Sequence, residues 1–277
     1  MLRLFISKLK IFRYPVLSII KFFDREISIK HHISNKPFHL ELYGHKGYWF
    51  FGRSRENYEI KLIQKLIKKD FKILEIGAHI GYLTVIFESI LSSDNLPNIV
   101  ACEPSPKTIN LLKKNIKSTT IIHDKAMTNQ VGKTISFYTE NHGGSTNSTI
   151  KRFTQDSLKY MSKSSHRVSE EIEEITVVTD TVDNFCRVNS FNPDFIKIDV
   201  EGAELSVLEG SLEQLKKVKV IMLEASQNQK QIYDLLIAND FRVFTPKMKE
   251  ITNYEGIEWT IFCFSNLHLE SLMRSLS

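Results

Sequence analysis

The fold of this chain is decided by one stretch, Phe195-Ile196-Lys197-Ile198-Asp199-Val200-Glu201-Gly202-Ala203-Glu204. Its apolar residues predict a buried strand, and the turn signal Asn192-Pro193 precedes them. After the glycine the spacing of the apolar residues becomes helical, at Leu205, Val207 and Leu208. The acidic residues therefore lie at the carboxyl end of a strand, which is the edge where open α/β sheets bind ligands.

The acids of this stretch have different explanations. Glu201 and Glu204 stand where a negative charge favours the start of the next helix through its dipole, so a structural role is open for both. Asp199 has little such explanation, because it ends the apolar strand before Gly202. A carboxylate so close to a core needs a partner such as a ligand, a metal or a hydrogen-bonded loop.

The size and composition of the chain suit one large α/β domain with an appendage. The sequence has 277 residues, with 42% apolar and 25% charged residues, which is ordinary for a globular protein with its own core. We expect residues 1–57 to form an N-terminal extension and residues 58–277 to form the main domain.

From about residue 58 onward, helix and strand signals alternate, which is typical of a mostly parallel sheet with helices on both faces. Strands are expected over residues 71–76, 98–102, 120–123, 175–178, 195–200, 218–223, 241–244 and 260–264, with helices between them. A polar stretch, residues 139–173, interrupts this order. So long a loop predicts either a lid over the site or a surface insertion.

The N-terminal extension is basic and apolar. Residues 1–30 hold seven basic residues against two acidic ones, so this segment carries the whole formal net charge of +5. The remainder is balanced, which argues against a nucleic-acid partner on a broad basic face. The basic residues are Arg3, Lys8, Lys10, Arg13, Lys21, Arg25 and Lys30.

Residues 1–23 interleave apolar side chains with these bases, so no apolar run approaches the roughly 20 residues that span a bilayer. A cleaved signal peptide also fits poorly, since the charges recur through Arg13 and no small-residue cleavage site follows. The pattern is typical of a basic segment on an anionic membrane surface, interrupted at Pro15. Packing on the protein's own core explains it equally well.

The three cysteines point to a reducing compartment. Cys102, Cys186 and Cys263 are isolated, each in or beside an apolar run. This pattern indicates reduced core thiols rather than a disulfide framework or a zinc site, so we expect a cytoplasmic protein.

A second motif, Glu75-Ile76-Gly77-Ala78-His79-Ile80-Gly81, combines the end of a strand, a glycine turn and the start of a helix. This local order is typical of nucleotide-type cofactor binding. A dinucleotide fingerprint needs a second glycine where His79 stands, because the bare backbone approaches the pyrophosphate there. Pyrophosphate binding is therefore disfavoured.

A third element is Glu103, which ends the strand Val100-Ala101-Cys102 and precedes Pro104-Ser105-Pro106. An acid at this position can accept hydrogen bonds from both ribose hydroxyls, although a structural role as an acid before a helix is also open. A cofactor with a ribose and no phosphate fits both motifs. S-adenosylmethionine is such a molecule, and its positive sulfonium fits the acids Glu75, Glu103 and Asp199.

These motifs, together with the stretch 126–132, Thr181-Val182-Asp183 and the Lys-x-Asp-x-Glu-Gly-x-Glu block, resemble the FkbM family of methyltransferases over about residues 70–245. The resemblance implies a Rossmann-like, seven-stranded, mostly parallel sheet with S-adenosylmethionine as methyl donor. It also implies an oxygen acceptor on a sugar, a glycan or a small natural product.

The resemblance assigns the cofactor residues by position. Residues lining the methionine portion would be Glu75, Gly77, Ala78, His79 and Gly81, with Glu103 on the ribose and Asp124 with Ala126 on the adenine side. The family commonly has Asp where Glu75 stands and Asn where His79 stands. The first 57 residues and the loop lie outside the resemblance.

Asp199 is the first candidate for removing the proton of the acceptor. If the strand stays extended through Glu201, both side chains point to one face, where they would share catalysis or hold Mg²⁺ together with Glu224. The alternative is that these acids pair with Lys197 or fix loops. His79 and His142 rank below Asp199 as bases, since a lone histidine is more often structural.

Two further functions remain open on the sequence alone. An NAD-dependent oxidoreductase shares the strand-turn-helix pattern, but His79 counts against it. A non-catalytic domain that keeps the fold for binding is the other.

Overall fold

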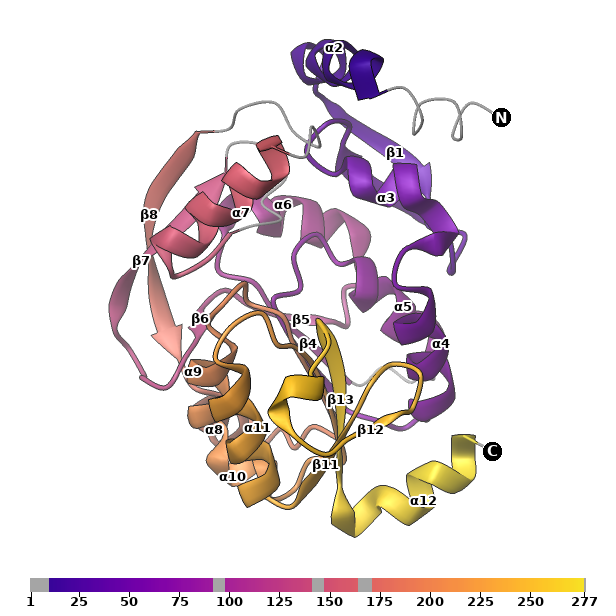
Figure 1. Cartoon of the computed structure of the whole chain (residues 1–277), viewed down its shortest axis with the longest axis vertical. Coiled ribbons are helices and arrows are strands. Elements are labelled where there is room, and N and C mark those ends of the chain that lie inside the picture. The colour runs from indigo at the N-terminus through magenta and orange to yellow at the C-terminus, as the bar shows by residue number, and fades with distance from the viewer. Residues whose placement is uncertain (1–9, 92–97, 141–146, 164–170, 277) are drawn as a thin grey trace. The chain divides into compact units, whose positions relative to one another are not determined.

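A computed structural model of the chain describes residues 10–91, 98–140, 147–163 and 171–276 (Figure 1). The chain divides into two compact units. One contains Met1–Arg55 and Ser136–Thr176, and the other contains Glu56–Ile135 and Val177–Ser277. The larger unit holds all the residues that the sequence assigns to the site, His142 excepted.

An eight-stranded sheet forms the centre of the larger unit. Its order is β12 (Glu250–Ile251), β11 (Phe241–Phe244), β13 (Thr260–Ser265), β10 (Val220–Glu224), β9 (Phe195–Ile198), β3 (Ile73–Ile76), β4 (Ile99–Cys102) and β5 (Ile121–His123). The five strands from β10 to β5 are parallel, and β13 runs antiparallel to both β10 and β11. The expected mostly parallel α/β sheet is therefore confirmed.

Edge strand β12 was not expected, and the strand expected over residues 175–178 belongs to β8 (Ile172–Asp180), which lies in another sheet. β12 has only two residues and pairs antiparallel with β11 at the edge of the sheet. A tight turn brings it there, because the amide of Met248 donates to the carbonyl of Thr245 at 2.9 Å. Two residues are too few for an alternating pattern, so the sequence carries no signal for this strand.

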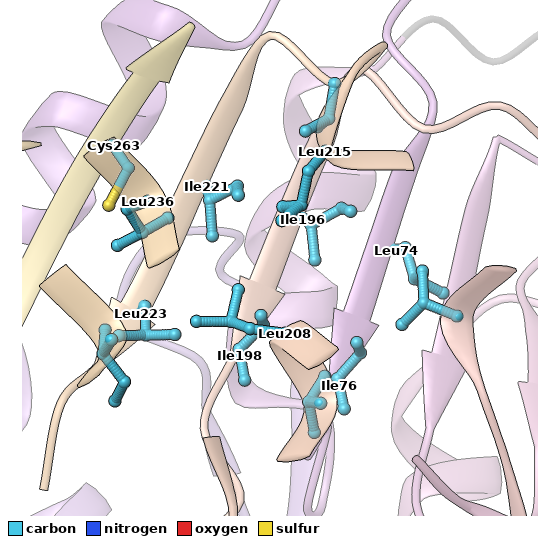
Figure 2. Close-up of a cluster of buried hydrophobic side chains, with 14 of the residues drawn as sticks. Leu74, Ile76, Ile196, Ile198, Leu208, Leu215, Ile221, Leu223, Leu236 and Cys263 are labelled. Carbon is cyan, nitrogen blue, oxygen red and sulfur yellow. The ribbon is translucent and has the colours of Figure 1, made fainter. Parts of the chain in front are cut away.

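Helices cover both faces of this sheet. Figure 1 shows α8 (Val182–Val188), α9 (Glu204–Glu209), α10 (Leu212–Leu215) and α11 (Gln229–Ala238) gathered on one side of the sheet. Figure 2 shows apolar side chains that lie between these helices and the strands. The sheet contributes alternate residues to this core, among them Leu74, Ile76, Ile196, Ile198, Ile221 and Leu223. The remaining helices of this unit are α4 (Asn57–Leu66), α5 (Tyr82–Ile90), α6 (Pro106–Asn115) and α12 (Asn266–Leu276), with a short 3₁₀ turn, η2 (Tyr254–Gly256).

The intervening residues of β3 and β9 point to the opposite face. There the ring of Phe195 lies 5.8 Å from the ring of Phe87 of α5. Glu75 and Lys197 are register partners on this same face, since side chains alternate along a strand. Two charged residues are therefore buried side by side in the middle of the sheet.

The smaller unit contains a helix, a hairpin and short helical segments. α2 (Lys10–Phe22) precedes the antiparallel hairpin of β1 (Glu26–Lys30) and β2 (Pro37–Glu41), followed by α3 (Lys46–Phe51) and the 3₁₀ turn η1 (Gly52–Ser54). A three-stranded sheet has the order β6 (Ala126–Met127), β8 (Ile172–Asp180) and β7 (Thr134–Glu140). The boundaries between the two units fall within β7, after Ile135, and within β8, after Thr176.

The sequence predicts a polar loop over residues 139–173, whereas the structure has helix α7 (Lys151–Lys163) there and begins β8 at Ile172. Among the residues of α7 whose side chains are described, 151–159, the buried ones are Phe153, Thr154 and Leu158. Thr154 takes a position that an apolar residue would normally fill, which hides the helical periodicity of this face.

The cysteines and the helix lengths test two further expectations. Cys102, Cys186 and Cys263 are buried free thiols, as expected, and burial raises the pKa of Cys186 to about 12. Within the described part of the chain, no helix combines the length and the hydropathy needed to cross a bilayer.

Gly77 allows β3 and β9 to approach closely where both strands end. It has φ +77°, and a Cβ built on it would lie 1.7 Å from the carbonyl oxygen of Asp199. Gly132 has a similar φ of +70° but open space around its Cβ position. Replacing each glycine by alanine therefore separates two costs in stability: Gly132 reports the backbone strain alone, and Gly77 reports the strain together with the steric clash.

We predict that Gly132→Ala lowers the free energy of unfolding by about 1–2 kcal/mol, the cost of a left-handed backbone. Gly77→Ala lowers it by at least about 2 kcal/mol more, because the two strand ends must separate. Urea unfolding followed by circular dichroism measures both. Equal losses in the two variants would show that the close approach of the strands does not exist.

Candidate functional site

The candidate site lies where four neighbouring parallel strands end: β4, β3, β9 and β10. This arrangement brings the glycine turn after β3 next to the acidic stretch after β9. The amide of Asp199 donates to the carbonyl oxygen of Ile76 at 3.1 Å, which continues the pairing of the two strands past their ends. Segments more than a hundred residues apart in sequence are therefore adjacent at one edge of the sheet.

The glycine turn is anchored to the end of β4. The amides of Gly77 and Ala78 both donate to the carbonyl oxygen of Cys102, each at 3.0 Å. Gly81 is the residue before α5, and a Cβ on it would lie 2.8 Å from a methyl group of Leu112 in α6. Gly77, Ala78 and Gly81 thus shape a turn without bulky side chains, and the missing side chain of Gly81 lets α5 and α6 pack closely.

His79 has a backbone role in the turn. Its φ is +52°, in the left-handed region, and its amide donates to Oε2 of Glu103 at 3.0 Å. Asparagine and histidine are both enriched in this region. The Asn commonly found at this position in the resembling family therefore has the same backbone preference as His79.

Glu103 is a buried carboxylate bound by two backbone amides. Oε2 accepts from His79, and Oε1 accepts from the amide of Ser105 at 3.0 Å. Burial raises the pKa of Glu103 to about 7, although the two amides lower it. The cap of helix α6 is Ser105, whose hydroxyl accepts from the amide of Thr108 at 3.4 Å. Glu103 is therefore not the helix cap, which weakens the structural alternative for this acid.

Glu75 lies inside the sheet, beneath the turn. Its Oε2 accepts a hydrogen bond from the hydroxyl of Thr84 in α5 at 2.6 Å. Burial raises the pKa of Glu75 to about 7, while the positive charge of Lys197 lowers it. The side chain thus ties β3 to α5, below the turn that the resemblance assigns to the methionine portion.

Lys197 joins the two halves of the site. Its Nζ donates to the carbonyl oxygen of Gly77 at 2.6 Å and lies 3.1 Å from Oδ2 of Asp199. The side chain is buried, and the negative charges of Asp199, Glu75 and Glu224 raise its pKa against the effect of burial. One ammonium group therefore holds the glycine turn and the acidic stretch in a fixed relation.

The acidic stretch turns sharply after β9. The strand ends at Ile198, and Glu201 has φ +54°. The expectation that the strand stays extended through Glu201 is therefore wrong, because the left-handed backbone turns the chain before helix α9. Glu204 is buried and accepts from the amide of Gly202 at 2.9 Å and from the hydroxyl of Ser226 at 3.1 Å. These contacts indicate a structural role for Glu204, which the sequence had left open as an alternative.

The carboxylates at this edge influence one another. Burial raises the pKa of Glu224 to about 8, and the charge of Asp199 acts in the same direction. The indole of Trp259 donates to Oε2 of Glu224 at 2.7 Å. Burial and the charges of Asp199 and Glu224 also raise the pKa of Glu201 well above its usual range.

The predicted magnesium site of Asp199, Glu201 and Glu224 is not supported. Among the residues that the structure describes, no group of three or more acids, histidines or cysteines is arranged to hold a metal ion. The contacts explain this result. Lys197 already pairs with Asp199, Trp259 binds Glu224, and the turn redirects Glu201.

The end of β5 holds the two residues assigned to the adenine side. Asp124 is exposed directly after β5, and Ala126 is buried in β6. The structure adds Asp180, which the sequence reasoning missed. Its Oδ1 accepts from the amide of Thr181 and from Asn184, both at 2.8 Å, and its Oδ2 lies 3.3 Å from Nε2 of His123. Its position directly before Thr181-Val182-Asp183 was the available signal.

Of the two histidines considered as bases, His79 and His142, the structure describes His79 alone. The backbone of His79 takes part in the turn, as above. His142 lies outside the described residues. Burial lowers the pKa of a third histidine, His123, whose ring packs edge-on against Phe185 at 4.7 Å.

A model of the methyltransferase FkbM domain matches residues 75–261. Comparison with curated protein sequences finds no match. Among solved structures, the chain is similar to the methyltransferase FkbM from Methylobacillus flagellatus KT, with 17% identity and a TM-score of 0.41 over 72% of this chain and 44% of that chain. The chain thus spans less than half the length of that protein.

Two further solved structures show similarity at the same level. One is the O-methyltransferase from Bacillus cereus in complex with SAH, with 16% identity and a TM-score of 0.40 over 77% of this chain and 81% of that one. The other is the precorrin-6y C5,15-methyltransferase from Geobacter metallireducens GS-15, with 12% identity and a TM-score of 0.36 over 76% and 86%.

The contacts of Lys197 generate a test of its bridging role. We predict that Lys197→Met lowers the free energy of unfolding by about 3–5 kcal/mol, because the buried Glu75 and the partly exposed Asp199 lose their counter-charge. Adding Glu75→Gln recovers part of this loss. The control is Lys219→Met, which removes the more exposed pair with Asp194 and costs about 1 kcal/mol. Chemical denaturation measures all three variants, and equal losses at Lys197 and Lys219 would contradict the bridging role.

The raised pKa of Glu103 generates a pH prediction. Between pH 4.5 and about 7 the folded protein keeps the proton that the unfolded chain releases, so the free energy of unfolding falls as pH rises. The side chain in the Glu103→Gln variant does not titrate in this range, so the variant lacks this pH dependence. The stability of the variant relative to the natural protein should therefore rise by about 3 kcal/mol across this range.

Denaturation curves for the two proteins at several pH values measure this difference. In the Glu103→Gln variant the side chain offers one acceptor to two amides, which costs stability at every pH and leaves the slope unaffected. Parallel stability profiles would contradict the burial of an ionisable Glu103.

Proposed function

Since the chain belongs to the FkbM family of methyltransferases, we propose that it transfers the methyl group of S-adenosylmethionine to a hydroxyl oxygen of a sugar, a glycan or a small natural product. Membership of the family supports methyl transfer with S-adenosylmethionine as donor. It counts against the oxidoreductase and the non-catalytic alternative. The observation that carries the proposal is the pairing of a glycine turn with Glu103 on one side and a Lys197-held Asp199 on the other.

The glycine turn and Glu103 support the donor half of the site. Each oxygen of Glu103 accepts one hydrogen bond from a backbone amide, and a carboxylate has further lone pairs that can accept hydrogen bonds from two ribose hydroxyls. His79 stands where pyrophosphate binding needs glycine, so a ribose without phosphate fits better. When bound, S-adenosylmethionine supplies a methyl carbon on a positively charged sulfur, and the acids at this edge fit that charge.

The other cofactor residues have supporting roles in this proposal. Gly77, Ala78 and Gly81 shape the turn that would line the methionine portion, and Glu75 supports that turn from below through Thr84 and Lys197. Asp124 and Ala126 would lie on the adenine side, with Asp180 fixing the end of β8 near His123. The amides of Gly77 and Ala78 already bind Cys102, so the turn would contact the cofactor through other atoms.

We assign the proton of the acceptor hydroxyl to Asp199. Methyl transfer forms a bond between the acceptor oxygen and the methyl carbon, breaks the bond from that carbon to sulfur, and moves the hydroxyl proton to a base. Asp199 is partly exposed at the end of β9, and Lys197 fixes its carboxylate from inside the sheet. The chain would contribute mainly by holding the acceptor oxygen about 3 Å from the methyl carbon.

Glu201 and Glu224 would form the wall around the acceptor. Burial raises the pKa of both, to about 8 for Glu224, so a protonated carboxyl group there can donate a hydrogen bond to an acceptor oxygen near neutral pH. Such donors suit a hydroxyl-rich acceptor such as a sugar. The three buried free cysteines support a reducing, cytoplasmic setting for the reaction.

Calorimetric titration with S-adenosylhomocysteine tests the donor half. We expect the natural protein to bind, and Glu103→Gln to bind at least about tenfold more weakly, because one charge-assisted interaction with the ribose is lost. Asp199→Asn should bind within about threefold of the natural protein, yet lose at least about a hundredfold in methyl transfer, the contribution of a positioned base.

Methyl transfer can be followed by mass spectrometry of metabolite and glycan extracts incubated with methyl-labelled S-adenosylmethionine. Glu250→Gln is the control, since Glu250 pairs with Arg242 at an exposed position. Undiminished binding of S-adenosylhomocysteine by Glu103→Gln would overturn the donor assignment. Full transfer by Asp199→Asn would overturn the assignment of the base alone.

A further inference from the structure

Helix α2 has apolar side chains on two opposite faces. Leu17 is 8% exposed, and on the same side the ammonium of Lys21 lies 5.7 Å from the centre of the Tyr43 ring. On the other side Ile19 is 59% exposed and Phe22 is 83% exposed. A surface helix normally turns its polar residues to water, so this outer face is unusual.

The outer face is a continuous arc that continues one residue past the helix. It consists of Val16, Ile19, Phe22 and Phe23, which we call the α2 apolar arc. Phe23 is 63% exposed, and its amide donates to the carbonyl oxygen of Ile19 at 3.2 Å, which extends the helical pattern. At about 100° per residue, these four lie opposite Leu17 and Lys21. The rings of Phe22 and Phe23 also touch edge-on, 5.1 Å apart.

The hairpin that follows α2 fixes the direction of this arc. Oδ1 of Asp24 accepts from the amide of Tyr43 at 2.7 Å, and the carbonyl oxygen of Arg25 accepts from the amide of Leu42 at 2.9 Å. Tyr43 itself is fully buried. The inner face of α2 is thus held by Tyr43, and the apolar arc cannot turn inward without breaking these contacts.

The sequence around the arc carries an excess of positive charge. Residues 1–30 contain seven basic and two acidic residues, so they account for the whole formal net charge of +5. Arg25 is exposed just past the end of α2, and Lys30 is exposed at the far end of β1. A second copy of the chain on this arc would bring two such positive segments together, whereas an anionic surface neutralises them.

We propose that the α2 apolar arc lies on an anionic lipid surface, with its four side chains between the headgroups and the neighbouring basic residues against the lipid phosphates. An exposed apolar face on a helix within a basic stretch of sequence is typical of segments that bind in the plane of a membrane. The proposal does not depend on the methyl acceptor or on the site described above.

Flotation of the full-length protein with lipid vesicles tests the proposal. The vesicles are phosphatidylcholine alone, or phosphatidylcholine mixed with phosphatidylserine. We expect binding to the mixed vesicles, weak binding to phosphatidylcholine alone, and a decrease as salt rises from about 0.1 M to about 1 M, because the screening length falls from about 10 Å to about 3 Å. Phe22→Ser with Phe23→Ser should lower binding at least about tenfold, since two large apolar side chains no longer leave water.

The matched control is Val188→Ser with Leu267→Ser, which removes two other apolar side chains that are 69% and 78% exposed. This control should bind as the natural protein does, and circular dichroism should show both double variants folded. No binding to the mixed vesicles would overturn the proposal, as would equal loss in both variants. If the protein does not bind vesicles but forms a concentration-dependent dimer, and Phe22→Ser with Phe23→Ser abolishes that dimer, the arc is an interface with a second copy instead.

Discussion

The buried ammonium of Lys197 is the group on which the rest of the site depends. It donates to the carbonyl oxygen of Gly77 and pairs with Asp199, and it lies beside Glu75 in the register of the sheet. A buried cation without such partners would be costly, so the contacts of Lys197 also fix the positions of those partners. Lys197 thus adds a side-chain link between the proposed donor half, on β3 and β4, and the proposed acceptor half, on β9 and β10.

The close approach of two backbones adds a second constraint. Gly77 lies against the carbonyl of Asp199, where a side chain would not fit. The glycine turn is then closed from the other side by Cys102 and by the carboxylate of Glu103. These contacts bring the turn, Glu103 and Asp199 together at one edge of the sheet, as the proposed in-line transfer between two molecules requires.

Local patterns in the sequence predicted the parts of the site that depend on neighbours in the chain. The apolar runs at 71–76, 98–102 and 195–200 indicated strands β3, β4 and β9, and the acids at their ends indicated Glu103 and Asp199. Contacts between distant residues had no such pattern. The bond from Trp259 to Glu224, the pairing of His123 with Asp180 and the carbonyl contact of Lys197 join residues that only the folded sheet brings together.

The expectations that proved wrong also concern features that depend on contacts between distant residues or on the local backbone conformation. The left-handed backbone of Glu201 turns the chain where a continuous strand was expected, and partners from other elements occupy the carboxylates that would have held magnesium. Helix α7 was hidden because a buried threonine interrupts its apolar face.

The most direct measurement is a crystal structure of the protein with S-adenosylhomocysteine bound. We expect both ribose hydroxyls to lie within hydrogen-bond distance of Glu103 and the sulfur to face the end of β9 at Asp199. A ligand that does not touch Glu103, or whose sulfur points away from Asp199, would contradict the division of the site into a donor half and an acceptor half.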